Sequence, residues 1–447
     1  MAHPAELPPR AYRGPLLRFH GDPGVAEVPG AYEYLPDALL VVSEGRIARV
    51  GPAAALLRDL PPDVPVLAHP QGLLMAGFID THIHFPQLDV IAAGGRALLD
   101  WLNDHTFPEE QRFANAAHAA SVAEVFLDEL ARNGTTTANV FCTVHPVSVD
   151  AFFGAAQRRG LRMIAGKVLM DRHAPQGLLD DAVTGIVDSR RLLETWHRRD
   201  RLLYAITPRF AITSTPAQLA ATGDLARDYP DAYVHTHLAE NHDEIAWVRE
   251  LYPDCQGYLD VYARHGLLRP RAIYAHCIHL DATERRRLAA SGATTAFCPT
   301  SNLYLGSGLF DLEGSDEAGL HYAIATDVGG GTSFSLLRTL GDAYKVAKLR
   351  GQYLPPLRAF YLASRGAARV LQLEHRIGTL AEGSEADFVI LDLQATPLIA
   401  RRSAASPTLS DQLRVLMTLG DERCIGATFS GGRPQHLAGA YARSHAA

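Results

Sequence analysis

The chain has 447 residues, of which 47% are hydrophobic and 20% charged, so it can bury a large core and is neither a disordered nor a collagen-like chain. Its 42 basic and 49 acidic side chains leave a formal net charge of −7. Because nucleic-acid binding needs a clustered positive surface, this balance argues against DNA or RNA as a partner.

The first residues, MAHPAELPPRAYRG, contain no apolar segment of signal-peptide length, and no later segment approaches the roughly 18 apolar residues that span a bilayer. We therefore expect a cytoplasmic protein that does not bind membranes. The cysteines are scattered and form no CxxC pair, so we expect reduced thiols rather than a disulfide framework or a zinc ribbon. The five are Cys142, Cys255, Cys277, Cys298 and Cys424.

Both ends of the chain have the sequence pattern typical of β-strands. Short alternating apolar segments broken by Pro and Gly, such as ALLVVSEGRIARVG at 38–51, predict strands and turns near the N-terminus. The same pattern returns beyond residue 375, in RIGTLAEGSEADFVILD and CIGATFSGGRP. Because neither piece alone could bury a core, we expect residues 1–73 and 373–447 to form one composite β-sandwich module.

The intervening residues, 74–372, alternate between apolar β-branched runs and Ala/Leu/Arg-rich stretches of helical length. Helices are expected at 121–132, 150–159, 186–199, 216–228 and 282–291. Eight strand-helix repeats over this length match a (β/α)8 TIM-like barrel in number and size. The eight runs are 73–84, 135–144, 162–171, 202–211, 232–241, 272–280, 294–303 and 321–330.

Histidines and acidic residues end four of these runs, which is where a barrel of this kind carries its chemistry. The first run ends with His82 and His84, and period-two alternation puts both imidazoles on one face of the strand. Taken alone, such a pair also fits two buried, hydrogen-bonded side chains. The other three runs contribute His235, His237 and Glu240, then His276 and His279, and finally Asp327.

This recurrence at separate strand ends predicts a metal site. Zinc takes nitrogen and carboxylate ligands, and a catalytic zinc leaves one position open for water. His82, His84, His237 and Asp327 would supply the protein atoms. We expect His235, deeper in its strand, to be structural, and His279 to lie exposed beyond the strand end.

Six segments resemble the amidohydrolase superfamily, through the barrel and both flanks. They are GFIDTHIHFPQ (77–87), TPRF (207–210), HTHLAEN (235–241), AHCIHL (275–280), CPTSNL (298–303) and ATDVGGG (325–331). Within that superfamily the chain resembles the guanine deaminase family, on Phe85-Pro86-Gln87, on WLNDHTFPEEQRF (101–113) and on Arg209-Phe210. One departure is Cys277, which stands where the family pattern has glycine, and is followed by His279.

The resemblance implies a role for each matching residue. His82, His84, His237 and Asp327 match the zinc ligands, Glu240 the proton-shuttling glutamate, and His276 the histidine that hydrogen-bonds the water or the tetrahedral intermediate. Gln87, Arg209 and Phe210 match positions that hold the purine. The family also implies hydrolysis of guanine to xanthine and ammonia, in a homodimer with one zinc ion in each subunit.

Purely structural roles for the three proposed purine-binding residues also fit the sequence. Arg209 could form a surface ion pair, Phe210 could belong to the barrel core, and Gln87 could cap a loop. Trp101 and Phe107 are candidates for a pocket lid, although buried packing explains them as well. The Gly329–Gly331 run lacks the Lys-Ser/Thr of a phosphate loop, and we expect it to allow close backbone approach.

Other functions also remain possible. Two-metal amidohydrolases, which the chain also resembles, bridge their ions with a carboxylated lysine at the end of the fourth strand. The fourth run here ends Thr-Pro-Arg-Phe at 207–210 and contains no lysine, and Lys167, on the third run, is expected to be structural, so we expect a single metal. A related hydrolase could act on a triazine, pterin or adenosine-type ring. Deaminases with a PCxxC motif are excluded because the chain has Cys-Pro-Thr-Ser at 298–301. A scaffolding relative would have lost the metal ligands.

Overall fold

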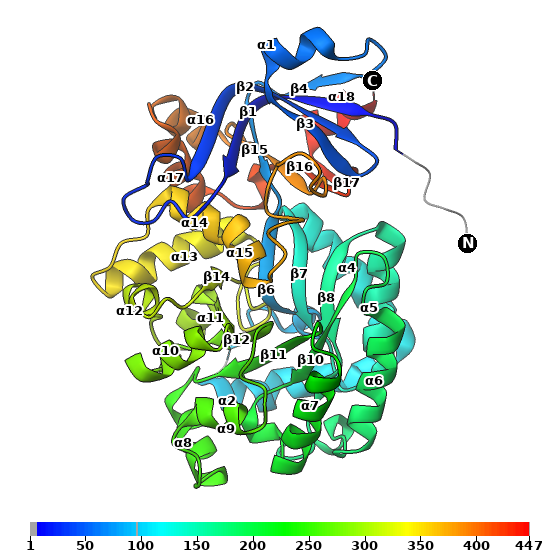
Figure 1. The fold of residues 1–447 in the computed structure, drawn as a ribbon, viewed down its shortest axis with the longest axis vertical. Coiled ribbons are helices and arrows are strands. Elements are labelled where there is room, and N and C mark those ends of the chain that lie inside the picture. The colour runs from blue at the N-terminus through cyan, green and yellow to red at the C-terminus, as the bar shows by residue number, and fades with distance from the viewer. Residues whose placement is uncertain (1–6, 95–96, 447) are drawn as a thin grey trace.

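The computed structural model describes residues 7–94 and 97–446, which form a (β/α)8 barrel and a separate mixed β-sheet that lies above it in Figure 1. Residues 1–6 and 447 lie outside the described part. They are the outer ends of the two expected flanking segments and include the start of the segment inspected for a signal peptide.

The barrel consists of parallel strands hydrogen-bonded in chain order, and each lies within one of the eight predicted runs, so the predicted fold class is confirmed. A short strand, β9 (Val168–Leu169), also pairs with β10. The eight are β6 (Phe78–His84), β7 (Thr135–Phe141), β8 (Arg162–Gly166), β10 (Leu203–Pro208), β11 (Tyr233–Leu238), β12 (Ala272–His276), β13 (Thr294–Phe297) and β14 (Tyr322–Ile324).

The barrel closes where its first strand meets the segment after its last strand. The Asp327 N–H donates to the His82 carbonyl oxygen at 3.0 Å, and the His84 N–H donates to the Val328 carbonyl oxygen at 2.8 Å. Closure therefore brings together the predicted metal-binding residues of β6 and of the chain after β14.

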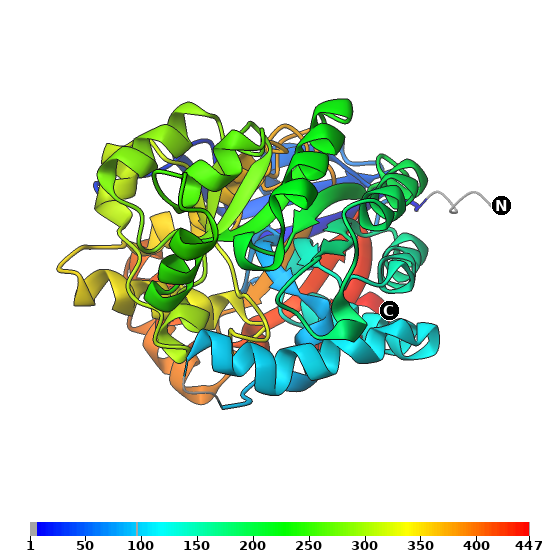
Figure 2. The ribbon, with the colours of Figure 1, turned by 90° about the horizontal axis from the view of Figure 1, so that it is seen from below.

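Helices surround the barrel, as the view from below shows (Figure 2). In α4 the Asn115 side chain accepts hydrogen bonds from two backbone amides at the start of the helix, and a stripe that includes Phe126 and Leu127 is buried. The barrel helices are α4 (Ala116–Arg132), α5 (Pro146–Arg159), α6 (Thr184–Trp196), α7 (Pro216–Asp228), α8 (His242–Leu251), α9 (Tyr258–Arg264), α10 (Ala282–Ala290), α11 (Pro299–Tyr304), α12 (Leu312–Glu317), α13 (Leu336–Leu349), α14 (Pro356–Leu362) and α15 (Arg365–Val370).

The mixed sheet joins the two ends of the chain, which confirms the composite module. Its strand order is β17-β16-β15-β5-β1-β2-β3, with β4 on β1, and the antiparallel pair β5–β15 connects the N-terminal and C-terminal parts. Tyr12, Phe388 and Phe429 pack in its core with ring centroids 4.4–5.0 Å apart. The strands are β1 (Arg10–Phe19), β2 (Tyr32–Ser43), β3 (Arg46–Pro52), β4 (Val66–Ala68), β5 (Gly72–Ala76), β15 (Phe388–Asp392), β16 (Ile425–Ser430) and β17 (Arg433–Leu437).

The first predicted run is two strands rather than one. β5 belongs to the mixed sheet and β6 to the barrel, and Gly77 joins them. A Cβ at Gly77 would lie 2.3 Å from side-chain atoms of Thr136, so only glycine allows the chain to pass so close to β7. The mixed sheet thus extends to Ala76, and the three-part division at residues 73 and 373 stays a prediction.

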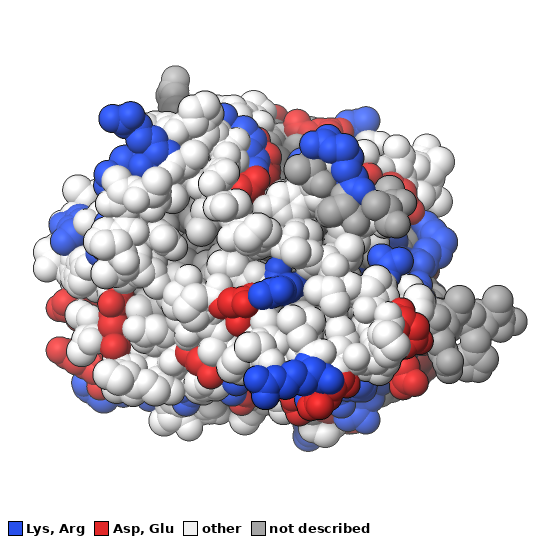
Figure 3. All heavy atoms as spheres, turned by 90° about the horizontal axis from the view of Figure 1, so that it is seen from above, with Lys and Arg blue, Asp and Glu red and all other residues white. Residues whose placement is uncertain are grey.

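Helices also accompany the mixed sheet or connect it to the barrel, and those between β15 and β16 were not predicted. They are α1 (Ala53–Leu56), α16 (Pro397–Ala404), α17 (Leu409–Leu419) and α18 (Gly439–Ala446). None of the helices in the described part of the chain has the length and hydropathy needed to cross a bilayer. On the face seen from above, charges of both signs are scattered among neutral side chains (Figure 3).

Four charged side chains, here called the ion cluster, connect the barrel to the mixed sheet; three of them are buried and Arg201 is half-buried. Arg162 begins β8 and Arg201 precedes β10, whereas Glu385 and Asp387 precede β15. Glu385 accepts hydrogen bonds from the Nε atoms of Arg162 at 2.7 Å and of Arg201 at 2.9 Å, and Arg201 also pairs with Asp387. The cluster lies at the amino ends of the barrel strands, opposite the predicted site.

Candidate active site

A cavity lies at the carboxyl ends of the barrel strands. Five of the residues that line it lie within three residues of the carboxyl ends of β6, β10, β11, β12 and β14: His84, Arg209, His237, His276 and Asp327. A helical segment formed by α2 (Leu98–Trp101), a wider π-helical turn (Leu102–Thr106) and α3 (Phe107–Gln111) supplies further lining residues. The fold thus collects most of the predicted site residues around one space.

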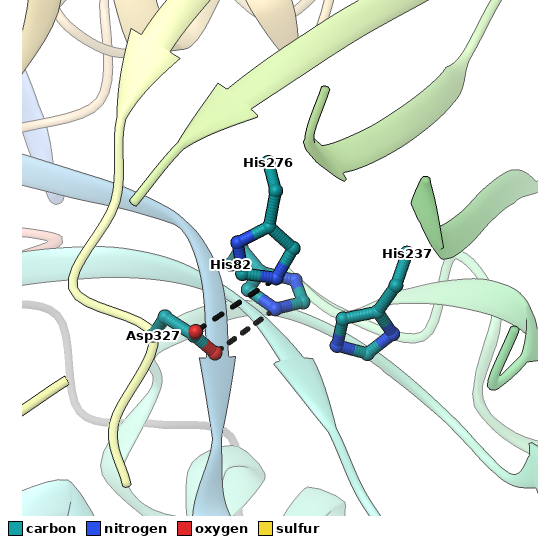
Figure 4. A group of neighbouring side chains, drawn as sticks. All are labelled: His82, His237, His276 and Asp327. Atoms are coloured by element: carbon teal, nitrogen blue, oxygen red, sulfur yellow. Dashed lines mark ion pairs between the residues drawn. The ribbon is translucent and has the colours of Figure 1, made fainter. Parts of the chain in front are cut away.

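Imidazoles and one carboxylate converge at the inner end of this cavity. Donor atoms of His82, His237, His276 and Asp327 all lie within 4.8 Å of one another. Figure 4 shows these four side chains pointing toward a common centre from separate strand ends. The Nε2 atom of His82 lies 3.1 Å from Oδ1 of Asp327.

His84 completes the group that the sequence predicted. Its Nε2 atom lies 3.2 Å from Nε2 of His82, 3.3 Å from Nε2 of His237 and 3.3 Å from Oδ1 of Asp327. The structure therefore brings His82, His84, His237 and Asp327 together, with His276 beside them.

The second nitrogen of two of these rings has a partner of its own. His237 Nδ1 donates to the Arg209 carbonyl oxygen at 2.7 Å, which leaves a bare lone pair on Nε2. His82 Nδ1 lies 2.8 Å from Nε2 of His235. His235 thus lies behind His82 rather than in the group itself, in agreement with its expected structural position, and such contacts hold a ring in the orientation that a metal ligand needs.

Burial keeps the His84 and His237 rings neutral, and the neighbouring histidine rings keep Asp327 ionised. Desolvation lowers the pKa of His84 to about 3 and holds the pKa of His237 well below its usual value. Burial alone would raise the pKa of Asp327, but the adjacent His82 and His84 rings hold it well below its ordinary value. Neutral imidazoles and an anionic carboxylate are the protonation states in which these groups bind a metal.

This donor set fits a divalent cation. In a tetrahedral zinc site with metal–ligand bonds of about 2.0–2.1 Å, ligand atoms lie roughly 3.3 Å apart. Four of the six separations among these atoms are 3.1–3.3 Å and match that spacing. Without a cation between them, bare nitrogen lone pairs would face each other in a buried space, which is unfavourable.

Glu240 faces the same group from the chain after β11. Its Oε1 accepts a hydrogen bond from Ser307 Oγ at 2.9 Å, and its Oε2 lies 3.2 Å from His276 Nε2. Burial raises the pKa of Glu240 well above its usual value, and the charges of Asp327 and Glu244 add to this rise. A carboxyl group of this kind can carry a proton at neutral pH.

The neighbourhood of His276 contains the departure from the family pattern. Asn302 Nδ2 donates to His276 Nδ1 at 2.9 Å, so the proton of the neutral ring is on Nε2, facing Glu240. Cys277 is buried outside the cavity lining and its sulfur accepts from Thr295 Oγ1. His279 is half-buried rather than exposed, and its Nε2 lies 2.8 Å from the Ser307 carbonyl oxygen.

The three predicted purine-binding residues lie together along one wall of the cavity. Phe210, Arg209 and Gln87 are all buried and all line it. Arg209 pairs with Glu110 at 2.7 Å and is 2% exposed, so the alternative of a surface ion pair is wrong. Gln87 donates from Nε2 to Glu110 at 3.1 Å and accepts from the Gly329 N–H at 3.1 Å.

The aromatic candidates divide between the cavity and its support. Trp101 lines the cavity, whereas Phe107 is buried beneath the Arg209 guanidinium, whose carbon lies 5.2 Å from the ring centroid. A Cβ at Gly329 would lie 2.5 Å from the Gln87 carbonyl oxygen, so the glycine run does permit a close backbone approach. Lys167 is buried and pairs with Asp180 at 2.6 Å.

Sequence reasoning missed Glu110, Ser307 and Asn302. Glu110 had a detectable signal, because residues 98, 102, 106 and 110 follow each other at helical spacing and the first three are Leu, Leu and Thr. A carboxylate on such a face needs a buried cation as its partner. Ser307 and Asn302 follow no period, and their partners come from distant elements.

Comparison with known proteins shows the same family along most of the chain. The Amidohydrolase family model matches residues 73–434. A curated guanine deaminase of Escherichia coli (strain K12) is 49% identical over 91% of this chain and 93% of its own.

Two solved structures extend the comparison to the fold. E. coli guanine deaminase matches with a TM-score of 0.94 and 47% identity, covering 96% of this chain and 100% of its own. Guanine deaminase from C. acetobutylicum, with bound guanine in the active site, matches with a TM-score of 0.85 and 26% identity, covering 96% and 100%. The chain belongs to the amidohydrolase family and, within it, to the guanine deaminases.

Proposed function

We propose that this enzyme hydrolyses guanine to xanthine and ammonia. Water adds its oxygen to carbon 2 of the purine, the bond from that carbon to the exocyclic nitrogen breaks, and the nitrogen leaves as ammonia. The observation that carries this proposal is a single cavity with a His/Asp group and Glu240 at one end and a wall of Arg209, Gln87 and Phe210 at the side. The similarity to guanine deaminases supports the same reaction.

We propose one zinc ion per subunit, held by His82, His84, His237 and Asp327. The protonation of His276 favours His84 as the fourth ligand, because His276 accepts from Asn302 and presents an N–H rather than a lone pair. His84 Nε2 also makes closer contacts with the other donor atoms: it lies 3.3 Å from Asp327, whereas His276 Nε2 lies 3.9 Å away. When bound, zinc lowers the pKa of a coordinated water to about 7 and so supplies a nucleophile at neutral pH.

The chain's own groups then move the protons. Asp327 accepts a proton from the attacking water, and Glu240 delivers a proton to nitrogen 3 of guanine as charge builds on the ring. His276 Nε2 lies 3.2 Å from a Glu240 oxygen and 3.9 Å from an Asp327 oxygen, and its N–H stabilises the oxygen that develops on carbon 2. The proton of the new hydroxyl group on carbon 2 then passes to ionised Glu240 and from it to the amine, which leaves as ammonia as the carbonyl forms. The proton held by Asp327 returns to Glu240 and restores the starting state.

The side wall orients the purine. Phe210 offers an aromatic face, Arg209 a donor for the 6-oxo oxygen, and Gln87 a polar edge for the ring. Because Arg209 is neutralised by Glu110, the wall suits a neutral ring rather than an anionic ligand.

The test is conversion of guanine to xanthine by the purified zinc enzyme, followed by ultraviolet absorbance and ammonia release. Adenine, cytosine, a pterin and a melamine-type triazine serve as comparison rings. We expect guanine to be turned over far faster than the others. Preference for any other ring would overturn the assignment.

Three further expectations stay proposals. We propose a cytoplasmic homodimer and a division into residues 1–73, 74–372 and 373–447, on the sequence patterns and the family resemblance. Light scattering on the purified protein measures the oligomeric state, and limited proteolysis tests the division.

A further inference from the structure

Glu110 connects the two polar residues of the cavity wall. Its Oε1 accepts from Gln87 Nε2 at 3.1 Å and from Arg209 Nη1 at 2.9 Å, and its Oε2 accepts from Arg209 Nη1 at 2.7 Å. Glu110 is fully buried and does not line the cavity, so it contacts these side chains from behind.

The contacts of Glu110 determine which N–H donors of Arg209 and Gln87 remain available to a ligand. Both bonds from Arg209 to Glu110 use Nη1, and Nη2 has no acceptor among the residues that the structure describes, so its donors remain for the cavity. Gln87 gives one amide proton to Glu110 while its oxygen accepts from Gly329, which fixes the amide orientation. The second amide proton has no acceptor in the described part of the chain.

The charge of Glu110 matters as much as its position. Arg209 lies in a cavity wall that is almost entirely closed to solvent, and its only carboxylate partner among the described residues is Glu110. With the pair intact the wall is electrically neutral but rich in hydrogen-bond donors. A neutral ring that bears a carbonyl oxygen fits such a wall, whereas a ring without that oxygen leaves buried donors unpaired, at a cost in binding.

We propose that Glu110 is a positioning residue that sets the preference for 6-oxopurines, by holding Arg209 and the Gln87 amide with their free donors toward the ring. This inference rests on the proposed function. It assigns to Glu110 no contact with the substrate, and its effect is transmitted through Arg209 and Gln87.

The test uses binding of two unreactive purines to the zinc-loaded enzyme, measured by calorimetry. Hypoxanthine carries the 6-oxo group and purine lacks it, and neither has the 2-amino group that reacts. Glu110→Gln should reduce the preference for hypoxanthine over purine by at least about tenfold, the effect of losing one charge-assisted hydrogen bond. Glu109→Gln is the matched control, because Glu109 is on the same helix but pairs with Arg112 and His118 outside the cavity.

A double variant separates positioning from structural support. Arg209→Ala should reduce the same preference, and adding Glu110→Gln to it should cause little further change. A wild-type preference in Glu110→Gln, or an equal loss in the Arg209→Ala background, would overturn the inference, whatever happens to thermal stability. Because binding is measured without turnover, failure of wild-type enzyme to deaminate guanine would count against the proposed function alone.

Discussion

Both ends of the barrel bury charged and polar groups, but the hydrogen bonding of these groups differs between the two ends. At the amino end, Glu385 accepts hydrogen bonds from both Arg162 and Arg201, and Asp387 accepts from Arg201, Ser430 and Gly431. At the carboxyl end, buried nitrogens such as His84 Nδ1 and His276 Nε2 have no hydrogen-bond partner among the residues that the structure describes.

This difference indicates that the ion cluster has a structural role and that the cavity has a chemical one. A buried charge is stable only when it is paired, so the ion cluster can hold the mixed sheet against the barrel without any ligand. The carboxyl end is incomplete by itself. Its neutral imidazoles and ionised aspartate need a cation, and the hydrogen-bond donors of Arg209 and Gln87 need the purine substrate. Changes at the carboxyl end should therefore affect turnover, and changes at the ion cluster should affect stability.

The largest effect is expected from His237→Ala. The protein should lose most of its zinc, and turnover should fall by about 10⁶-fold or more, toward the uncatalysed rate. Metal content measured by mass spectrometry and ammonia release would check this. His242→Ala, on the exposed start of α8, is the control and should keep both metal and activity. Full zinc occupancy in the His237 variant would contradict the ligand assignment.

Glu240→Gln should keep the metal and the fold but lose the proton shuttle. We expect turnover to fall by about 10²–10⁴-fold, the typical contribution of a positioned proton transfer. The readouts are zinc content, melting temperature and the rate of ammonia release, with exposed Glu250→Gln as the control. Ammonia release at the wild-type rate would refute the role of Glu240.

Glu385→Gln should act on stability instead. It leaves the buried Arg162 guanidinium with no acidic partner among the described residues and half-buried Arg201 with Asp387 alone. Breaking a buried ion pair typically costs about 3–5 kcal/mol. Chemical denaturation would measure the loss, and kcat of the folded enzyme should not change. Glu382→Gln, at an exposed position nearby, should have little effect. If Glu385→Gln lowered kcat without lowering the free energy of unfolding, the ion cluster would not have the structural role proposed for it.

The ion cluster also predicts a pH dependence of stability. Burial would raise the pKa of Glu385, but its hydrogen bond to Arg162 and the charge of Arg201 more than offset this and lower the pKa from 4.5 to about 2. Because the folded-state pKa is depressed, the stabilisation is complete above about pH 5 and is lost as the pH falls toward 2. Unfolding free energies across this range should fall less steeply in Glu385→Gln than in the wild type. Equal slopes would mean that Glu385 does not carry the effect.

The sequence predicted the barrel and its metal-type residues because both follow short-range periodicity. Alternation within a strand placed His82 and His84 together, and the rule that carboxyl ends meet placed Asp327 beside them. The division of the first run at Gly77 was missed, because both of its halves are apolar strands and only the three-dimensional contact with Thr136 distinguishes them.

Partners that come from unrelated elements were harder to predict. The ion cluster joins Arg162 to a glutamate 223 residues away, and Glu110 lies 99 residues from Arg209. No periodic pattern relates such positions. Glu110, at helical spacing on a buried face, was the one detectable sign. It indicated that a basic side chain must pair with it, but not that this side chain is Arg209.

The most direct test is to react guanine with the zinc enzyme in water enriched in heavy oxygen and to analyse the product by mass spectrometry. Hydrolytic attack on carbon 2 predicts xanthine that carries one solvent oxygen at that carbon, with one ammonia released for each molecule formed. Guanine that stays unchanged, or a product labelled at another carbon, would contradict the account.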